Sequence, residues 1–399
     1  MKFAGRMNNL MAGNKELMDI MSMADGPDLI KFSGGFPSPE TYPIEDIKET
    51  MIAVLQRDAK AALSYSNTIG YDPLRIQIAE RMKKNTGLDF EKEQVLLTSG
   101  SQQGLDLSGL LFIDKGDIVL FETPSYLGAL NVLKVYEAQL VAVPTDEEGI
   151  ITEALEEALK KYGERVKLVY VNPDYQNPTG RSWSHERRGE FIKLVSAYNI
   201  AVIEDGAYAE LSFGEKRRLP LITYDQVGQV IYLGTFSKTF CPGLRIGWIL
   251  ANRTLIQQYL ALKTNVDLSA ASILQRQVSY YLESKDLDKH IGEITSLYKH
   301  RRDVMVKAIK TQFPLQVKSN VPEGGLFIWV ELPQGSDTRE LLKACIQENV
   351  AFVPGAAFYP HGDRNNEMRL NFSNVPDEDI ERGITILGGA IKKYLENQQ

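Results

Sequence analysis

The chain has 399 residues, and its 45 lysines and arginines against 52 aspartates and glutamates give a net charge of −7. Hydrophobic residues make up 43% of the sequence and charged residues 24%, which is typical of a soluble globular enzyme and excludes a disordered chain. The acidic balance argues against nucleic acid and anionic membranes as partners. At this length we expect one large domain and a smaller one, because single cores seldom exceed roughly 300 residues.

The number and spacing of cysteines and histidines, together with the hydropathy of the sequence, exclude further classes of protein. Two cysteines cannot form a disulfide framework or a cysteine-based zinc site, and four widely separated histidines lack metal-ligand spacing, so we expect no metal. The N-terminus has no continuous apolar stretch of the kind found in signal peptides. Charged residues interrupt the most apolar region, 105–121, so it cannot span a bilayer. These features predict a cytoplasmic protein.

From about residue 90 to 250, short apolar runs alternate with helical stretches, a pattern typical of a sheet with helices on both faces. Several runs are rich in valine, isoleucine and leucine without alternation, as in strands buried on both faces. Segments with helical periodicity at 152–162 and 185–197 lie between them. The predicted strands are 95–98, 118–121, 140–143, 167–171, 201–204, 230–233 and 246–250.

The pattern changes after residue 250. The predicted helix 287–309 has one apolar face, formed by Ile291, Ile294, Tyr298 and Met305. Short predicted strands follow, and together they indicate a second, α+β domain; they are 326–331, 350–353 and 368–372. The first 40 or so residues have no core of their own, so we expect them to pack across the domain junction. The predicted parts are an N-terminal segment 1–44, a large domain 45–275 and a small domain 276–399.

Five of the predicted strands run into polar, turn-rich segments. These segments begin at Ser99, Glu122, Asn172, Asp205 and Gly234. Open α/β sheets bind ligands just beyond the carboxyl ends of their strands. The sequence therefore predicts one shared site at this edge of the sheet.

Lys238 ends the last of these segments, and lysine is the residue that forms imines with carbonyl compounds when it is partly neutral. An arbitrary loop lysine is usually solvated. Here, however, Thr235 and Ser237 offer hydroxyls, and Arg245 offers a planar fork of donors suited to a phosphate. A lysine beside a phosphate site indicates a phosphorylated carbonyl cofactor.

Other strand ends offer matching groups, each with a structural alternative. The turn that opens at Ser99 aims backbone N–H groups at an anion, although most such turns are only helix caps. Asp205 could pair with a protonated ring nitrogen or serve as a turn residue. Tyr208 could donate to a phenolate oxygen or line the core, and Tyr126 could stack on an aromatic ring.

Taken together, these motifs resemble the fold-type I, pyridoxal-phosphate-dependent aminotransferases of class I and II. Within this family the chain is similar to the branch of aminoadipate and kynurenine aminotransferases and of the catalytic domain of MocR-type regulators. The resemblance implies the fold of these transferases: α/β, with a mainly parallel seven-stranded sheet between helices and a smaller α+β domain. It covers nearly the whole chain and rests on the motifs 100–104, 176–180, Asp205 with Tyr208, and 235–245.

The resemblance also implies a role for each candidate site residue. Lys238 would form the Schiff base with pyridoxal 5'-phosphate, Asp205 would pair with the pyridine nitrogen, and Tyr126 would stack on the ring. Asn177 and Tyr208 would bond the ring oxygen, and Asn177 would also face the substrate. The implied phosphate ligands are Ser101, Gln102, Thr235, Ser237 and Arg245.

Three more residues carry the implied substrate and subunit contacts. Arg369 would grip the substrate α-carboxylate through a two-pronged pair, and Gly35 would close over the substrate. Tyr65 matches the tyrosine that reaches the phosphate of the neighbouring subunit, which implies a homodimer with shared sites. One departure from the family is Lys15, near where some aminoadipate-active relatives use an arginine for an acidic side chain.

The expected reaction moves an amino group from an L-amino acid to a 2-oxo acid, by resemblance 2-oxoglutarate, in a ping-pong sequence through Lys238. The donor would be aromatic, long aliphatic or aminoadipate-like. A carbon–sulfur β-lyase is an alternative that would share Lys238 and Asp205. A non-enzymatic effector domain of a regulator is disfavoured, because the chain is acidic and the first family motif begins at Ser33, which leaves no room for a DNA-binding domain.

Overall fold

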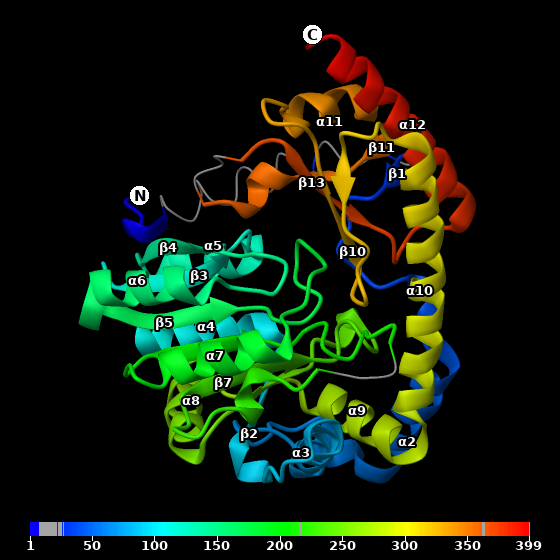
Figure 1. The fold of residues 1–399 in the computed structure, drawn as a ribbon. Helices are drawn as coiled ribbons and strands as arrows, with labels where there is room; N and C mark the ends of the chain where they lie inside the picture. The colour runs from blue at the N-terminus through cyan, green and yellow to red at the C-terminus, as the bar shows by residue number, and fades with distance from the viewer. Residues whose placement is uncertain (8–21, 23–25, 27, 215–217, 361–363, 399) are drawn as a thin grey trace.

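The computed structural model describes residues 1–7, 22, 26, 28–214, 218–360 and 364–398. A seven-stranded sheet with the order β2-β8-β7-β6-β5-β3-β4 forms the centre of the larger part of the molecule (Figure 1). β8 is antiparallel to both of its neighbours, and all other pairs in this sheet are parallel. The strands are β2 (Val95–Thr98), β3 (Ile118–Thr123), β4 (Gln139–Pro144), β5 (Val166–Val171), β6 (Ala201–Asp205), β7 (Val230–Thr235) and β8 (Gly247–Leu250).

All seven strands predicted from the apolar runs are confirmed, and their ends differ from the predicted bounds by at most two residues. Alternate residues of these strands enter different cores, because both faces of the sheet are covered. On β3, for example, Val119 and Phe121 pack under α4 (Ser101–Phe112), α5 (Leu127–Val135) and α8 (Arg253–Val266). Ile118 and Leu120 pack under α6 (Thr152–Tyr162) and α7 (His185–Val195) on the other face. The expected fold class, α/β with a mainly parallel sheet between helices, is thus confirmed.

Polar caps explain where several helices begin. α7 follows Ser184, α8 follows Asn252 and α10 follows Asp286; each of these side chains accepts a backbone N–H from the first turn. The helices are α2 (Ile44–Ala62), α3 (Asp72–Thr86), α4 (Ser101–Phe112), α5 (Leu127–Val135), α6 (Thr152–Tyr162), α7 (His185–Val195), α8 (Arg253–Val266), α9 (Ser272–Ser284), α10 (Leu287–Gln312), α11 (Thr338–Gln347) and α12 (Asp377–Glu396).

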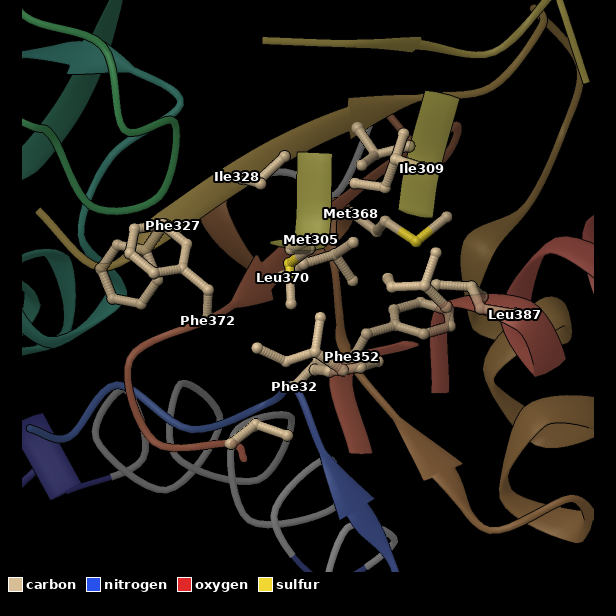
Figure 2. Packing of buried hydrophobic residues seen from close by; sticks show 14 of the residues in the cluster. Phe32, Met305, Ile309, Phe327, Ile328, Phe352, Met368, Leu370, Phe372 and Leu387 are labelled. Atoms are coloured by element: carbon tan, nitrogen blue, oxygen red, sulfur yellow. The ribbon is translucent and has the colours of Figure 1, made fainter. Parts of the chain in front are cut away.

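The C-terminal region, residues 318–398, contains an antiparallel sheet with the order β12-β13-β10-β9. Its core joins this sheet to α10, α11 and α12, and Figure 2 shows Phe352, Met368 and Leu387 meeting there. Phe32 from the N-terminal segment is fully buried in the same core. The strands are β9 (Lys318–Ser319), β10 (Phe327–Glu331), β12 (Val353–Pro354) and β13 (Glu367–Asn371).

The prediction of one continuous strand at 350–353 is wrong. β11 (Val350–Ala351) pairs in parallel with β1 (Ile30–Lys31), whereas β12 pairs with β13 in the other sheet. Phe352 lies between the two short strands, and its ring is buried in the C-terminal core. The chain therefore changes sheets at this residue because its pairing partner is the N-terminal segment, more than 300 residues away in sequence.

α10 runs along both parts of the molecule (Figure 1). The apolar face predicted for it is buried, but it serves two cores. Ile291 packs with the residues around Phe240 beside the seven-stranded sheet, whereas Ile294, Tyr298 and Met305 pack in the C-terminal core. The predicted domain boundary at residue 275 stays a prediction. None of the helices in the described ranges is long and apolar enough to cross a bilayer.

Candidate active site

Five parallel strands of the large sheet end at the same edge, and each delivers a residue predicted for the site. Thr235 and Asp205 are the last residues of β7 and β6. Ser101 begins α4 after a two-residue connection from β2, and Tyr126 follows β3. Asn177 lies in the turn after β5.

Lys238 is half-buried three residues beyond β7, and its Nζ donates a 2.8 Å hydrogen bond to the carbonyl of Gly35. The same nitrogen lies 5.8 Å from the centre of the Tyr208 ring. Burial, followed by the positive charge of Arg369, lowers the pKa of Lys238 to about 8, although Asp205 acts in the opposite direction. A substantial fraction of the amine is therefore neutral at mildly alkaline pH, which imine formation requires.

Asp205 is a buried carboxyl with hydrogen bonds to both oxygens. The Tyr170 hydroxyl donates to Oδ2 at 2.7 Å, and the backbone N–H of Ala207 donates to Oδ1 at 3.2 Å. Burial raises the pKa of Asp205, while these hydrogen bonds and the charge of Lys238 lower it. Within the described residues Asp205 has no ion-pair partner at contact distance, so a protonated ring nitrogen would supply the missing positive charge.

Arg369 stands on β13 and is almost completely buried, with 7% of its surface exposed. Its Nη1 donates to Oδ1 of Asn177 at 2.8 Å, and its Nη2 donates to the carbonyl of Ser33 at 2.9 Å. Burial lowers the pKa of the guanidinium to about 10. Nε has no hydrogen-bond partner in the described part of the chain. The Arg369 guanidinium is therefore a buried cation that has no carboxylate partner among the described residues.

Two aromatic rings hold the Arg369 guanidinium in place. Its carbon lies 4.3 Å from the centre of the Phe327 ring and 5.2 Å from that of Phe358. Phe327 also packs edge-on against Tyr208 at 5.8 Å. The Tyr208 hydroxyl in turn accepts a hydrogen bond from Nδ2 of Asn177 at 3.5 Å. The C-terminal region and the edge of the large sheet therefore meet around Tyr208.

A candidate anion-binding site lies where the N-terminus of α4 approaches Arg245. Thr235 Oγ1 donates to Ser237 Oγ at 2.9 Å, and Arg245 Nη1 donates to the same oxygen at 3.3 Å. Gly100, which precedes α4, has a left-handed backbone with a φ of 80°, and a Cβ there would lie 2.3 Å from Arg245 Nη2. The first N–H groups of α4 have no side-chain cap, so they and Arg245 could hold a phosphate.

The remaining predicted residues differ in how directly they join this cluster. Gln102 Nε2 donates to the carbonyl of Gly128 at 3.4 Å. The half-buried Tyr126 ring lies over Gly128, where a Cβ would come within 2.4 Å of it. Tyr65 is 89% exposed and is not part of the cluster in a single chain. Lys15 lies outside the described residues, and within the described ranges no group of His, Cys, Asp and Glu could hold a metal.

Sequence reasoning missed three buried residues behind the site. Tyr170 lies within the apolar run of β5, where no local signal distinguishes it from a core residue. Glu122 and Asn172 stand in the strand-end segments that the sequence marked, but the sequence assigned them no role. Both are buried, and Asn172 N donates to Glu122 Oε1 at 2.5 Å.

Comparisons with known proteins agree with this geometry. A family model described as aminotransferase class I and II matches residues 27–387. An aromatic-amino-acid aminotransferase of Thermococcus litoralis is 42% identical over 384 residues, which cover 96% of this chain and 92% of that protein. HTH-type transcriptional regulators, the relatives of MocR type, are more distant.

Two solved structures share the fold and contain the cofactor or an adduct of it. The kynurenine aminotransferase of Pyrococcus horikoshii, in complex with PMP, is 40% identical with a TM-score of 0.91 over 95% of both chains. The alpha-aminoadipate aminotransferase of Thermus thermophilus, complexed with N-(5'-phosphopyridoxyl)-L-leucine, is 34% identical with a TM-score of 0.91 over 99% of this chain and 98% of that chain. The buried Asp205 carboxyl, the amine of Lys238 and the uncapped end of α4 fit the same cofactor. The chain belongs to the class I and II aminotransferases and is a transaminase that uses pyridoxal 5'-phosphate.

Proposed function

We propose that this transaminase acts on L-amino acids with aromatic, long aliphatic or aminoadipate-like side chains and passes their amino group to 2-oxoglutarate. One observation carries the assignment of the site. Lys238 donates to the carbonyl of Gly35, while Arg369 donates to the carbonyls of Ser33 and Gly34. The amine and the guanidinium therefore face one tripeptide, a spacing that suits the amino group and the carboxylate of an α-amino acid.

Each residue of the cluster has a proposed part in the reaction. Pyridoxal 5'-phosphate, when bound, supplies a carbonyl group and an electron-withdrawing ring. Lys238 would bind the carbonyl and, once displaced by the substrate, its neutral Nζ would take the α-proton and deliver it to the carbonyl carbon of the cofactor. Asp205 would keep the ring nitrogen protonated, with Asn177, Tyr208 and Tyr126 orienting the ring.

The phosphate and the substrate carboxylate would be bound at opposite ends of the cluster. Arg369 would pair with the carboxylate in two-pronged fashion, and Gly35 would lie against the substrate. The proposed phosphate ligands are Ser101, Gln102, Thr235, Ser237, Arg245 and, from the second subunit, Tyr65.

The proposed donor range rests on the relatives and on the surroundings of Arg369. The Thermococcus relative acts on aromatic amino acids, and the Pyrococcus structure holds kynurenine. The rings of Phe327 and Phe358 flank Arg369 here, and Phe36 of the adjoining N-terminal segment is exposed. Apolar surface of this kind favours aromatic and aliphatic side chains. An aminoadipate-like donor is the extension that the Thermus relative suggests.

The proposal includes a cytoplasmic homodimer with shared sites and no nucleic acid partner. Large apolar side chains at and just beyond α2 are open to solvent in a single chain, and Leu63 is 73% exposed. Ile52, Leu55 and Tyr65 are exposed nearby in the sequence. Exposed apolar groups of this size favour coverage by a second copy. Size-exclusion chromatography with light scattering tests the homodimer by measuring the molar mass of the protein in solution. An enzyme that is active as a monomer would contradict the proposal of shared sites.

The first experiment is the visible spectrum of the purified enzyme during addition of single amino acids without an acceptor. We expect a yellow protein whose band disappears with aromatic or long aliphatic donors and returns with 2-oxoglutarate. Release of pyruvate and ammonia from a cysteine conjugate without an acceptor would instead identify the β-lyase. A yellow protein that no amino acid bleaches would contradict the proposed reaction.

A further inference from the structure

Glu122 lies at the centre of a buried polar network behind the cofactor site. Its carboxyl is fully buried near the end of β3, with no positively charged partner in the described residues. Oε1 accepts the backbone N–H of Asn172 at 2.5 Å, and Oε2 accepts the indole N–H of Trp183 at 3.0 Å. Both oxygens of this carboxyl are therefore acceptors for fixed donors.

Asn172 links two parts of the site through a single amide. Its Nδ2 donates to the backbone carbonyl of Asp205 at 2.6 Å, and its Oδ1 accepts the backbone N–H of Asn177 at 2.9 Å. One partner ends β6, and the other lies in the turn after β5, so the amide sets the distance between two loops. Its orientation is unambiguous because one end faces a carbonyl and the other faces an N–H.

We propose that Glu122 is a positioning residue of the cofactor site: by accepting hydrogen bonds on both oxygens it fixes Asn172, and Asn172 fixes the backbones of Asp205 and Asn177. This inference rests on the proposed roles of Asp205 and Asn177 toward the cofactor. The network matters because a carboxylate and an amide must reach the same ring from different strand ends. Small displacements of such groups weaken binding, as they do for outer-shell partners of metal ligands.

The test is Glu122→Gln, which keeps the size of the side chain but replaces one acceptor oxygen with a donor amide. That amide must face either the N–H of Asn172 or the indole of Trp183, and one buried donor loses its acceptor. We expect the dissociation constant of pyridoxal phosphate to rise about tenfold or more. Visible titration of the cofactor-free chain measures it at a pH above the Lys238 pKa of about 8, with thermal unfolding recorded in parallel.

Glu204→Gln is the matched control. Glu204 is also fully buried and accepts two N–H groups, those of Leu221 at 2.6 Å and Ile222 at 3.1 Å, but it does not bond Asn172. We expect this variant to unfold at a lower temperature while its affinity for pyridoxal phosphate stays within about twofold of wild type. Equal losses of affinity in both variants would show that any buried carboxyl matters, and would overturn the proposal.

Adding Trp183→Phe to Glu122→Gln provides a rescue. In this double variant the new side-chain amide at position 122 no longer faces the indole N–H, so its oxygen can accept from Asn172 again. We expect the cofactor affinity of the double variant to exceed that of Glu122→Gln, although loss of the indole lowers the unfolding temperature further. A purely structural role predicts instead that affinity and stability fall together, and that outcome would overturn the proposal.

Asn172→Asp tests the network from its other end and serves if Glu122→Gln does not fold. Aspartate keeps an acceptor for the N–H of Asn177 but places an oxygen against the carbonyl of Asp205. We expect a loss of affinity of about tenfold or more. Wild-type affinity in this variant or in Glu122→Gln would overturn the inference alone. Failure of the wild-type chain to bind pyridoxal phosphate would instead contradict the proposed function.

Discussion

Asp205 and Arg369 face one site from two regions of the molecule, and different forces hold them. Asp205 ends a strand of the large sheet, where hydrogen bonds from Tyr170 and Asn172 fix its side chain and backbone. Arg369 stands on β13, whose neighbouring residues Met368 and Leu370 are buried in an apolar core. Hydrogen bonds thus orient groups at the sheet edge, whereas apolar packing sets the position of the C-terminal region.

Because different forces hold the two regions, substitutions in each region should change a different property of the enzyme. Substitutions of the polar groups that face the cofactor site at the sheet edge are expected to change cofactor affinity and turnover more than they change stability. Apolar truncations in the C-terminal core are expected to change stability first. Arg369 belongs to both regions, because its backbone lies in the apolar sheet while its guanidinium bonds Asn177 at the edge.

Lys238→Ala at the sheet edge should have the largest effect on activity. We expect turnover to fall by at least about a thousandfold, because the variant loses both the nucleophile and the base. The phosphate and ring contacts persist, so the variant should still bind the cofactor non-covalently. Steady-state kinetics and the visible spectrum measure the two effects. Lys285→Ala, which removes a half-buried lysine that pairs with Asp46 and Glu49 outside the site, is the control. Near-normal turnover of Lys238→Ala would contradict the assignment.

Arg369→Lys separates substrate binding from cofactor binding. A lysine keeps the positive charge but not the two-pronged geometry, so kcat/KM for amino acids should fall about a hundredfold. Affinity for pyridoxal phosphate should stay near wild type. Arg382→Lys, at an exposed pair on α12, provides the comparison. A variant with normal kcat/KM would mean that Arg369 does not bind the carboxylate.

Leu387→Ala perturbs the apolar core of the C-terminal region without touching the polar cluster. The side chain is fully buried in the C-terminal core (Figure 2), so its truncation should lower the free energy of unfolding by about 2–5 kcal/mol. Denaturant titration measures the loss. The folded fraction should keep its cofactor affinity, whereas a large loss of affinity would show that the two regions are more tightly coupled. Thr385→Ala, exposed on the same helix, should have little effect.

The rate of covalent capture of pyridoxal phosphate by the cofactor-free enzyme should depend on pH. Since the pKa of Lys238 is lowered to about 8, the fraction of Lys238 in the reactive neutral form rises as the pH approaches 8 and levels off at higher pH. Stopped-flow absorbance follows this rate. Arg369 contributes to the lowering, so Arg369→Leu should move the midpoint to higher pH. An unchanged midpoint would exclude this electrostatic coupling between the two regions.

The smallest expected effect is that of Tyr65→Phe. Loss of one phosphate contact from the neighbouring subunit should weaken cofactor binding by about three- to tenfold. The fold of the single chain should not change, because Tyr65 is exposed there. Titration with pyridoxal phosphate at several enzyme concentrations measures the effect. An affinity equal to that of wild type would argue against shared sites.

Local patterns were enough to predict much of the fold. The strands of the large sheet are continuous apolar runs bounded by turn residues, and that pattern depends on few neighbours in sequence. The same argument failed at 350–353, because the split between β11 and β12 depends on β1 at the other end of the chain. A pattern within four residues cannot specify a partner so distant.

The candidate site divides in the same way. The strand-end segments placed Lys238, Asp205 and Thr235 at one edge, because parallel strands end together. The position of Arg369 came from the resemblance, and its aromatic neighbours Phe327 and Phe358 were not foreseen. Phe327 reaches Arg369 through the pairing of β10 with β13, and Phe358 follows β12, which pairs with the other side of β13. Tyr170 resembled a core residue because its hydroxyl finds its partner, Asp205, only on the neighbouring strand β6.

The apolar strands, the amphipathic helices and the polar groups at the strand ends were predictable from the sequence, because each depends on residues close together in the chain. That the carbonyls of residues 33–35 face both Lys238 and Arg369 became clear only from the three-dimensional fold. It also decided that one asparagine, Asn172, joins Asp205 to Asn177. The physical reason is that a buried donor takes whichever acceptor the packing of distant elements brings within reach.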